Sequence, residues 1–349
     1  MIKRLVYGLL FLLLGCVEPY KLKVEDGPQL LTVEGILHTG PGPHLIRITR
    51  SSTYGGTNRG LIQPVLGAVV EITDNEEQKV SLEENLSSKG NYFTPQGFRA
   101  EVGKSYTLKI QTREGQTYTS QPERVESVPP IENLLIRTVT IPVEGKTNPR
   151  SGVQLISEFK DPADQKNYYF FRISPIIHIL QARPDLYVIR ETREPAPKPC
   201  CYVCYRTEAV ENQGLFIAQD NDFNGLTARI PGAFIEDEGL RFVQRLRVDL
   251  KQYSISEEAY QFLRFVKQQT EIKGSIFDTP PATIRGNMSN INDPEEVVLG
   301  YFISAGESVK RIYINREDLT YRQNQGLVPD DCREIPGATV FPPADWLTE

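Results

Sequence analysis

The sequence has few of the side chains on which most active sites depend. Its 349 residues include three His, two Met and one Trp. His38, His44 and His178 follow no spacing that would bring them together in one site. The sequence also lacks a G-x-S-x-G nucleophile motif, an H-E-x-x-H zinc motif and a Gly-rich phosphate loop. We therefore expect a protein that is not an enzyme and has neither catalytic residues nor a cofactor.

Charge and hydropathy narrow the range of partners. The 39 Lys and Arg residues face 45 Asp and Glu residues, and the net charge of −6 argues against nucleic acid as a partner. Beyond the first 15 residues, no apolar run is long enough to span a bilayer. The chain is still 39% hydrophobic, which is enough to build a buried core.

The composition predicts a mostly β fold in two domains. Gly (26) and Pro (25) are frequent, as are Tyr (16) and Phe (15), a profile typical of strands joined by many turns. The length exceeds that of a single small sandwich. We expect an Ig-like or transthyretin-like β-sandwich at 28–128 and a larger β-rich domain with one helix at 129–349. The paired Pro129 and Pro130 mark the boundary.

Alternating apolar and polar residues, bounded by turn residues, predict the individual strands. In the first domain these are 30–37, 44–51, 68–75, 106–112 and 116–122. In the second they are 153–159, 168–174, 186–192, 214–220, 245–253, 297–305 and 310–315.

One helix is expected within the second domain. Ser256 is its predicted N-cap, and the helix should end near 270–273, before Gly274. Its apolar face is formed by Ala259, Phe262, Leu263 and Val266. Nothing places a catalytic group on this helix, so we expect it to pack against the sheet.

The N-terminal residues indicate a lipoprotein. Lys3 and Arg4 precede an apolar stretch that is too short to span a bilayer and is typical of a signal peptide covering 1–15. It ends in Leu-Leu-Gly-Cys, which resembles a bacterial lipobox and marks Cys16 as the lipidated residue. Residues 16–27 then form a short tether. We expect anchoring by lipid alone, in the outer membrane, with the membrane face left open.

Four Cys remain for disulfides or for a metal: Cys200, Cys201, Cys204 and Cys332. An even count in an exported chain indicates two disulfides, at least one of them between the mid-chain cluster and the C-terminal part. Because neighbouring Cys rarely bond to each other, we favour Cys200 or Cys201 with Cys204 and the other with Cys332. The alternative is a four-cysteine zinc site built on the Cys201-x-x-Cys204 pair.

Two acidic segments are candidates for further chemistry. Asp220, Asp222 and Asn224 match the first half of a calcium loop, but Pro231 stands where the bidentate carboxylate belongs. A plain turn rich in Asp and Asn is therefore the default interpretation, with no bound metal. Asp161 and Asp164 could act as an acid–base pair in a pocket, but a loop N-cap after strand 153–159 is the favoured interpretation.

A longer run resembles a known family. Residues 274–287, GSIFDTPPATIRGN, continue through Asn290, Asp293 and Glu295 to Leu299-Gly300-Tyr301-Phe302. This pattern is similar to that of the Bacteroidota lipoprotein family called domain of unknown function 4249. The early Leu-Thr-Val-Glu-Gly at 31–35, the Pro-Gly-Pro-His turn at 41–44 and the Tyr-Thr-Ser-Gln-Pro segment at 118–122 add to the resemblance. Members of this family often accompany TonB-dependent transporters.

The resemblance implies an accessory role at the outer membrane. We expect a binding or scaffold protein beside a TonB-dependent barrel, acting by surface complementarity through loops and aromatic patches. The first alternative is an independent cell-surface protein that binds a glycan or a peptide. The second is a hydrolase that uses Asp or Glu pairs, which would need a deep pocket with two carboxylates roughly 5–10 Å apart.

Overall fold

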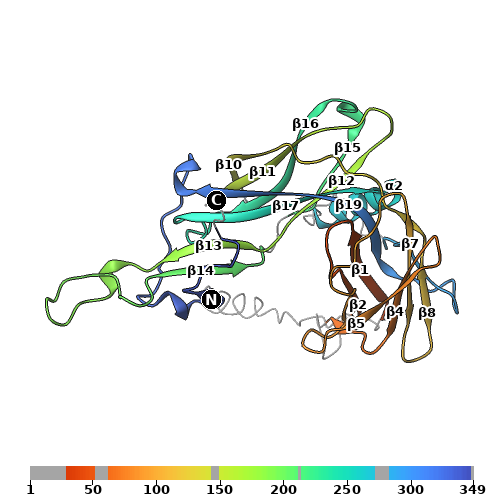
Figure 1. Cartoon of the computed structure of the whole chain (residues 1–349), viewed down its shortest axis with the longest axis horizontal. Coiled ribbons are helices and arrows are strands. Elements are labelled where there is room, and N and C mark those ends of the chain that lie inside the picture. Colours follow the sequence, from red (N-terminus) through yellow and green to blue (C-terminus); the bar gives the residue numbers. More distant parts are fainter. Residues whose placement is uncertain (1–28, 52–61, 143–148, 211–213, 272–282, 347–349) are drawn as a thin grey trace, which may run out of the picture.

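Strands are the main secondary structure in a computed structural model that describes residues 29–51, 62–142, 149–210, 214–271 and 283–346. These strands form one 17-stranded hydrogen-bonded set and one three-stranded sheet (Figure 1). The predicted mostly β fold is therefore confirmed. The predicted signal peptide, Cys16, the tether and residues 274–282 lie outside the described residues.

The first part of the chain forms a β-sandwich. Its strands are β1 (Leu31–His38), β2 (Leu45–Arg50), β3 (Gln63–Pro64), β4 (Val69–Asp74), β5 (Lys79–Glu84), β6 (Asn91–Phe93), β7 (Ser105–Gln111), β8 (Thr117–Ser120) and β9 (Glu123–Arg124). Strict alternation in β7 buries Tyr106, Leu108 and Ile110, and these side chains meet Ile46 and Ile48 of β2 in one core.

Two strands from late in the chain complete this sandwich. β18 (Met288–Asn290) pairs with β8, and the first half of β19 (Leu299–Asn315) runs parallel to β1. Met288 and Phe302 consequently lie in the same core as the first-domain residues. The boundary near residue 128 stays a prediction about folding units, but hydrogen-bonded ladders cross it.

The second part consists of two further layers. β10 (Asn133–Ile141), β11 (Arg150–Lys160) and β16 (Thr227–Glu236) form the antiparallel three-stranded sheet. It faces a sheet built from β12 (Tyr168–Ile173), β13 (Ile176–Gln181), β14 (Val203–Glu208), β15 (Phe216–Gln219), β17 (Arg245–Ile255) and β20 (Ala338–Thr339). Their shared core contains Val153 and Leu155 of β11 with Val248 and Leu250 of β17.

β19 joins the two parts. The sequence predicts two strands at 297–305 and 310–315, whereas the structure has one strand of 17 residues. The predicted break does not occur because Gly306 pairs with Ser254 and Val309 with Lys251, so the ladder with β17 continues through this segment. One rigid strand therefore supports both the first sandwich and the larger sheet.

The α-helix of the second part is α2 (Glu257–Thr270), as predicted. The Ser256 hydroxyl accepts a hydrogen bond from the Ala259 backbone N–H, which makes Ser256 the N-cap. Ala259 and Leu263 are buried against Ile255 and Tyr301, so the predicted apolar face does pack on the sheet. None of the described helices has the length and apolar character that crossing a bilayer requires.

Candidate functional site

A cleft of about 1030 Å³ opens where the first sandwich, α2 and β19 meet. It is lined by side chains from 121–126, 165–168, 255–265 and 285–287, and by Tyr301. We call it the seam cleft. Its walls come from segments far apart in the sequence, because β19 brings the end of the signature run against β9.

A buried carboxylate lies in the wall of the seam cleft. Glu123 of β9 is only 4% exposed. Its Oε1 accepts hydrogen bonds from the Tyr301 hydroxyl at 2.6 Å and from the Asn287 amide at 3.3 Å, and its Oε2 accepts one from the Ser256 hydroxyl at 2.8 Å. Burial raises the pKa of Glu123 and outweighs these bonds. No Lys or Arg in the described part of the chain forms an ion pair with it.

The partners of Glu123 are themselves held in place. The Asn287 side-chain amide donates to the Phe302 carbonyl at 2.8 Å and accepts from the Phe302 N–H at 3.0 Å. These two bonds to the backbone of β19 fix the orientation of the amide. The Ser256 hydroxyl accepts a hydrogen bond from the Ala259 N–H in the first turn of α2 and donates one to the Glu123 carboxylate. Gly286 makes this approach possible, because a Cβ there would lie 1.5 Å from the Gly300 carbonyl oxygen.

The rim of the cleft carries charges of both signs. Burial, and after it the interaction with Glu257, raises the pKa of the Tyr168 phenol to about 12. Glu258 follows Glu257 in the first turn of α2. Lys166 and Arg285 also line the cleft; both are exposed and have no hydrogen-bond or ion-pair partner among the described residues. The cleft is therefore suited to a polar ligand.

A second feature is an arm that projects from the larger sheet. Residues 182–202 connect β13 to β14 and extend well beyond the ends of both strands (Figure 1). Leu186 is 43% exposed and Val188 is 48% exposed. A short turn orders the tip, since the Arg193 N–H donates to the Ile189 carbonyl at 2.8 Å and Val188 bridges to Pro195.

The arm corrects one strand prediction. Residues 186–192 alternate like a strand, but a 3-10 turn at Pro184–Leu186 and one isolated bridge replace it. Pro195, Pro197 and Pro199 have no N–H to donate, and Arg193 adopts a positive φ of 59°. The return segment therefore cannot form a regular ladder with 186–192.

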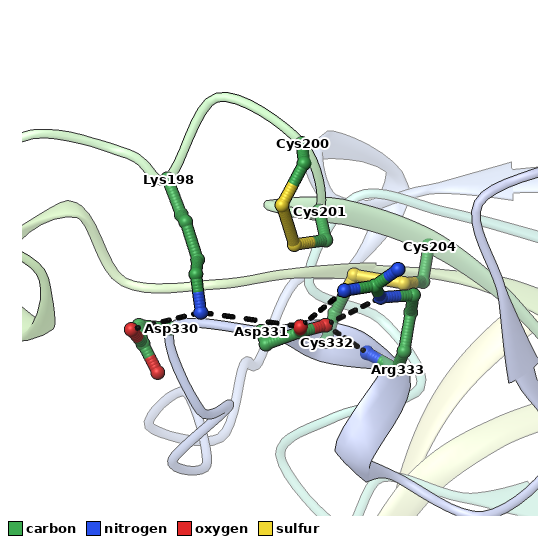
Figure 2. The surroundings of a disulfide bond; sticks show 8 residues. All are labelled: Lys198, Cys200, Cys201, Cys204, Asp330, Asp331, Cys332 and Arg333. Carbon is green, nitrogen blue, oxygen red and sulfur yellow. Dashed lines mark hydrogen bonds and ion pairs between the residues drawn. A yellow bond between two sulfur atoms is a disulfide. The ribbon is translucent and has the colours of Figure 1, made fainter.

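Disulfides hold the base of the arm (Figure 2). Cys204 of β14 bonds to Cys332, which lies 128 residues away in a 3-10 turn, Cys332–Glu334. Cys200 bonds to Cys201. Lys198 adds an ion pair to Asp330 at 3.6 Å. The predicted long-range bridge to the C-terminal part is confirmed, and it fixes the C-terminal segment against the arm.

The favoured cysteine pairing was wrong. The Cys332 N–H donates to the Cys201 carbonyl at 3.0 Å, and this backbone contact holds Cys332 next to the cysteine cluster. In this position the Cys332 sulfur bonds to Cys204 and not to Cys201. Cys200 and Cys201 are left to each other. The four-cysteine zinc alternative is contradicted, because Cys204 and Cys332 bond to each other. Among the described residues, no group of three or more His, Cys, Asp or Glu is placed to hold a metal ion.

The calcium candidate has a structural role. Asp220 is buried, and its carboxylate accepts the Asn167 N–H at 2.8 Å. Its carbonyl accepts the N–H groups of Phe223 and Asn224, which closes the turn. Asp222 lies in the same 3-10 turn, Asp220–Asp222.

Asp161 belongs to the same loop cluster. It is buried, accepts the Tyr169 hydroxyl at 2.5 Å and accepts the Gly225 N–H at 3.1 Å. Burial raises its pKa. Asp164 is exposed on the adjoining bend. Through these hydrogen bonds, Asp161 holds the loop after β11 in place.

Two of the three histidines do meet, which sequence spacing did not predict. The rings of His38 and His44 are 4.3 Å apart between centroids, and His38 Nδ1 lies 3.2 Å from Glu307. The sequence does hold a signal for this contact, since the Gly-Pro-Gly-Pro turn between β1 and β2 returns the chain on itself. His178 is separate, buried on β13, with its Nε2 3.2 Å from Glu208.

Fold and cleft together define a mostly β protein with a polar site at the junction of a sandwich and a larger sheet. The family described as domain of unknown function (DUF4249) matches residues 17–311, so this chain belongs to that family. A comparison with curated proteins finds no match. Asn287 and Tyr301, both within the signature run, turn out to be partners of Glu123. Nothing in the local sequence marks Glu123 in the same way, because its sequence neighbours are polar too.

Proposed function

We propose that this protein is a lipid-anchored outer-membrane binding and scaffold protein that accompanies a TonB-dependent transporter. The lipobox at Cys16 supports the location, as does the association with TonB-dependent transporters that the family resemblance implies. The observation that carries the proposal is the arm at 182–202, which we assign as the contact with the transporter. It acts by surface complementarity and performs no chemistry.

Exposed aliphatic side chains on a braced projection are suited to a partner. Leu186 and Val188 leave nearly half of their surface in solvent, so a partner that covers them gains apolar burial that the chain itself does not supply. The Cys204–Cys332 bond and the Lys198–Asp330 ion pair hold the arm in one position before contact. Preorganisation of this kind lowers the entropic cost of binding.

The charges of the arm favour a protein over a lipid surface. Asp185, Glu191 and Glu194 stand among its apolar residues and would lose hydration in a bilayer. The arm also carries Arg183, Arg190, Arg193 and Lys198, so its two signs nearly balance. A protein surface with an apolar centre and a polar rim of both signs is its complement.

Affinity purification from detergent-solubilised outer membranes tests the proposal. The full-length chain carries a C-terminal tag in its native host, and mass spectrometry quantifies what is recovered with it. We expect a TonB-dependent barrel in near-equal amount with the wild type and its loss with the double variant Leu186→Asp, Val188→Asp. The control is Leu86→Asp, which changes an 88% exposed residue of the first sandwich. Recovery of the lipoprotein alone would contradict the proposal.

The seam cleft favours a second candidate, an independent cell-surface protein that binds a peptide or a glycan. In that case no barrel co-purifies, yet the isolated protein binds a small ligand in the cleft. The two candidates therefore give opposite results in the purification.

The cleft also gives the hydrolase alternative a site at which it can be tested. Glu123, with its raised pKa, and Glu258 both line it, as an acid–base pair would require. A hydrolase would release products from a peptide or glycan mixture, and Glu123→Gln would abolish that release. We expect no product with either protein.

A further inference from the structure

We propose that the seam cleft is a binding site for a short peptide with a free amino terminus. The peptide ammonium lies against Glu258 and Glu123, and its carboxyl end faces Lys166 and Arg285. This site lies outside the arm and is independent of the contact with a transporter.

The size of the cleft admits several residues of peptide. Its volume of about 1030 Å³ is at the upper end of the roughly 300–1,000 Å³ typical of small-molecule sites. One side is open, so an extended ligand enters without any rearrangement of the sheet. The walls belong to β9, α2 and β19, which gives the site rigid support.

The buried carboxylate supplies the first recognition element. Glu123 is 96% withdrawn from solvent and lines the cavity, but its three partners are neutral donors. A carboxylate accepts about four hydrogen bonds, so one acceptor position remains. A ligand ammonium fills that position and supplies the positive charge that the described chain does not.

Glu258 reinforces this end of the cleft. Its carboxylate is close enough to raise the pKa of Glu123, and no hydrogen-bond or ion-pair partner occupies it among the described residues. A cation placed between the Glu123 and Glu258 carboxylates therefore stabilises the ionised form of both groups. Glu257 is already engaged with Tyr168 and is not needed for this contact.

Cations and aromatic rings supply the other elements. Lys166 and Arg285, which have no ion-pair partner within the described ranges, offer positive charge for a terminal carboxylate. Phe265 is half exposed, and the Phe262 ring lies 5.0 Å from that of Tyr301, which forms an apolar wall. An apolar side chain of the ligand packs on this wall.

Only a peptide matches all of these groups at once. An oligosaccharide offers hydroxyls and would leave the carboxylates and cations without counter-charges. A simple anion would meet Glu123 and Glu258, and a simple cation would meet Lys166 and Arg285. A zwitterionic peptide supplies an ammonium, a carboxylate, backbone amides and an apolar side chain together.

Calorimetric titration of the full chain, purified in detergent, tests this site. The probes are Ala-Phe-Ala, N-acetyl-Ala-Phe-Ala and maltotriose. We expect Ala-Phe-Ala to bind, acetylation to weaken binding about tenfold or more, and maltotriose not to bind. Glu258→Gln should weaken Ala-Phe-Ala similarly and leave the acetylated peptide unaffected. Glu83→Gln, an exposed change in β5, is the matched control and should have no effect.

Three results would overturn the inference: equal binding of the free and acetylated peptides, binding of maltotriose without peptide, or no binding of Ala-Phe-Ala. Thermal unfolding of each variant verifies folding, which the exposed position of Glu258 should preserve. Because this measurement uses purified protein alone, its failure leaves the proposed contact with a transporter intact. Loss of the transporter contact likewise leaves the peptide site intact.

Discussion

The Tyr301 hydroxyl donates a hydrogen bond of 2.6 Å to the Glu123 carboxylate, although 178 positions separate the two residues. Glu123 ends the first sandwich, and Tyr301 lies in the strand that both parts of the molecule share. The bond therefore ties the wall of the seam cleft to the architecture of the whole chain.

Removing this hydroxyl should destabilise the protein. Tyr301→Phe leaves the buried Glu123 with one donor fewer, at a cost of about 1–3 kcal/mol in the free energy of unfolding. Urea denaturation measures the loss. Tyr321→Phe is the control, because Tyr321 is 52% exposed and should change stability little. Equal effects of the two variants would show that the Glu123 contact adds nothing.

Glu123 should give the stability a definite pH dependence. Its pKa is raised in the folded state, so the folded protein holds this proton more tightly than the unfolded chain does. The associated stability is present below the unfolded pKa of about 4.5 and is lost as pH rises through the folded pKa. Wild type should thus lose stability relative to Glu123→Gln between pH 4 and pH 7. If the stability of wild type relative to Glu123→Gln stayed constant or rose over this pH range, the prediction would be contradicted.

His44 should act in the opposite direction. It is 1% exposed, and burial next to His38 lowers its pKa to about 4. The Phe98 carbonyl and Glu307 partly oppose this shift, while Lys251 adds to it. As pH falls, the unfolded chain takes up the proton before the folded protein does. The free energy of unfolding therefore decreases as pH falls from 6.5 to 4, by up to about 3 kcal/mol. Urea denaturation of His44→Gln beside wild type should show this fall in wild type alone.

The two disulfides should contribute unequally to stability. Cys204–Cys332 closes a long loop, and its removal in Cys204→Ala, Cys332→Ala should cost about 2–5 kcal/mol. The Cys200–Cys201 bond encloses no intervening residue, so Cys200→Ala, Cys201→Ala is the matched control with a much smaller cost. Limited proteolysis should cut the arm faster only in the first variant. Equal cleavage of both would show that the long-range bond does not brace the arm.

Local patterns predicted the helix and the regular strands well. Ser256 and the apolar spacing of α2 are features of adjacent residues, and they fixed its position nearly to the residue. The 186–192 segment has an equally good alternation but forms no strand, because its return segment is rich in proline. Strand pairing depends on a neighbour, which alternation within one segment does not reveal.

The site was harder to predict for the same reason. Asn287 and Tyr301 stood out in the signature run, but their common partner Glu123 is one acidic residue among many. Its burial follows from the long parallel pairing of β1 with β19, a contact between opposite ends of the chain. The Cys204–Cys332 pairing likewise depends on where the C-terminal segment returns. Such contacts have no local signature.

Site-specific photo-crosslinking in native outer membranes tests the central claim most directly. A photoreactive amino acid replaces Val188 at the arm or, as a control, Leu86 of the first sandwich, which is more exposed than Val188. We predict that a TonB-dependent barrel is crosslinked from position 188 and not from position 86. No crosslink to a barrel from position 188, or equal crosslinking from both positions, would contradict the assignment of the arm as the contact with a transporter.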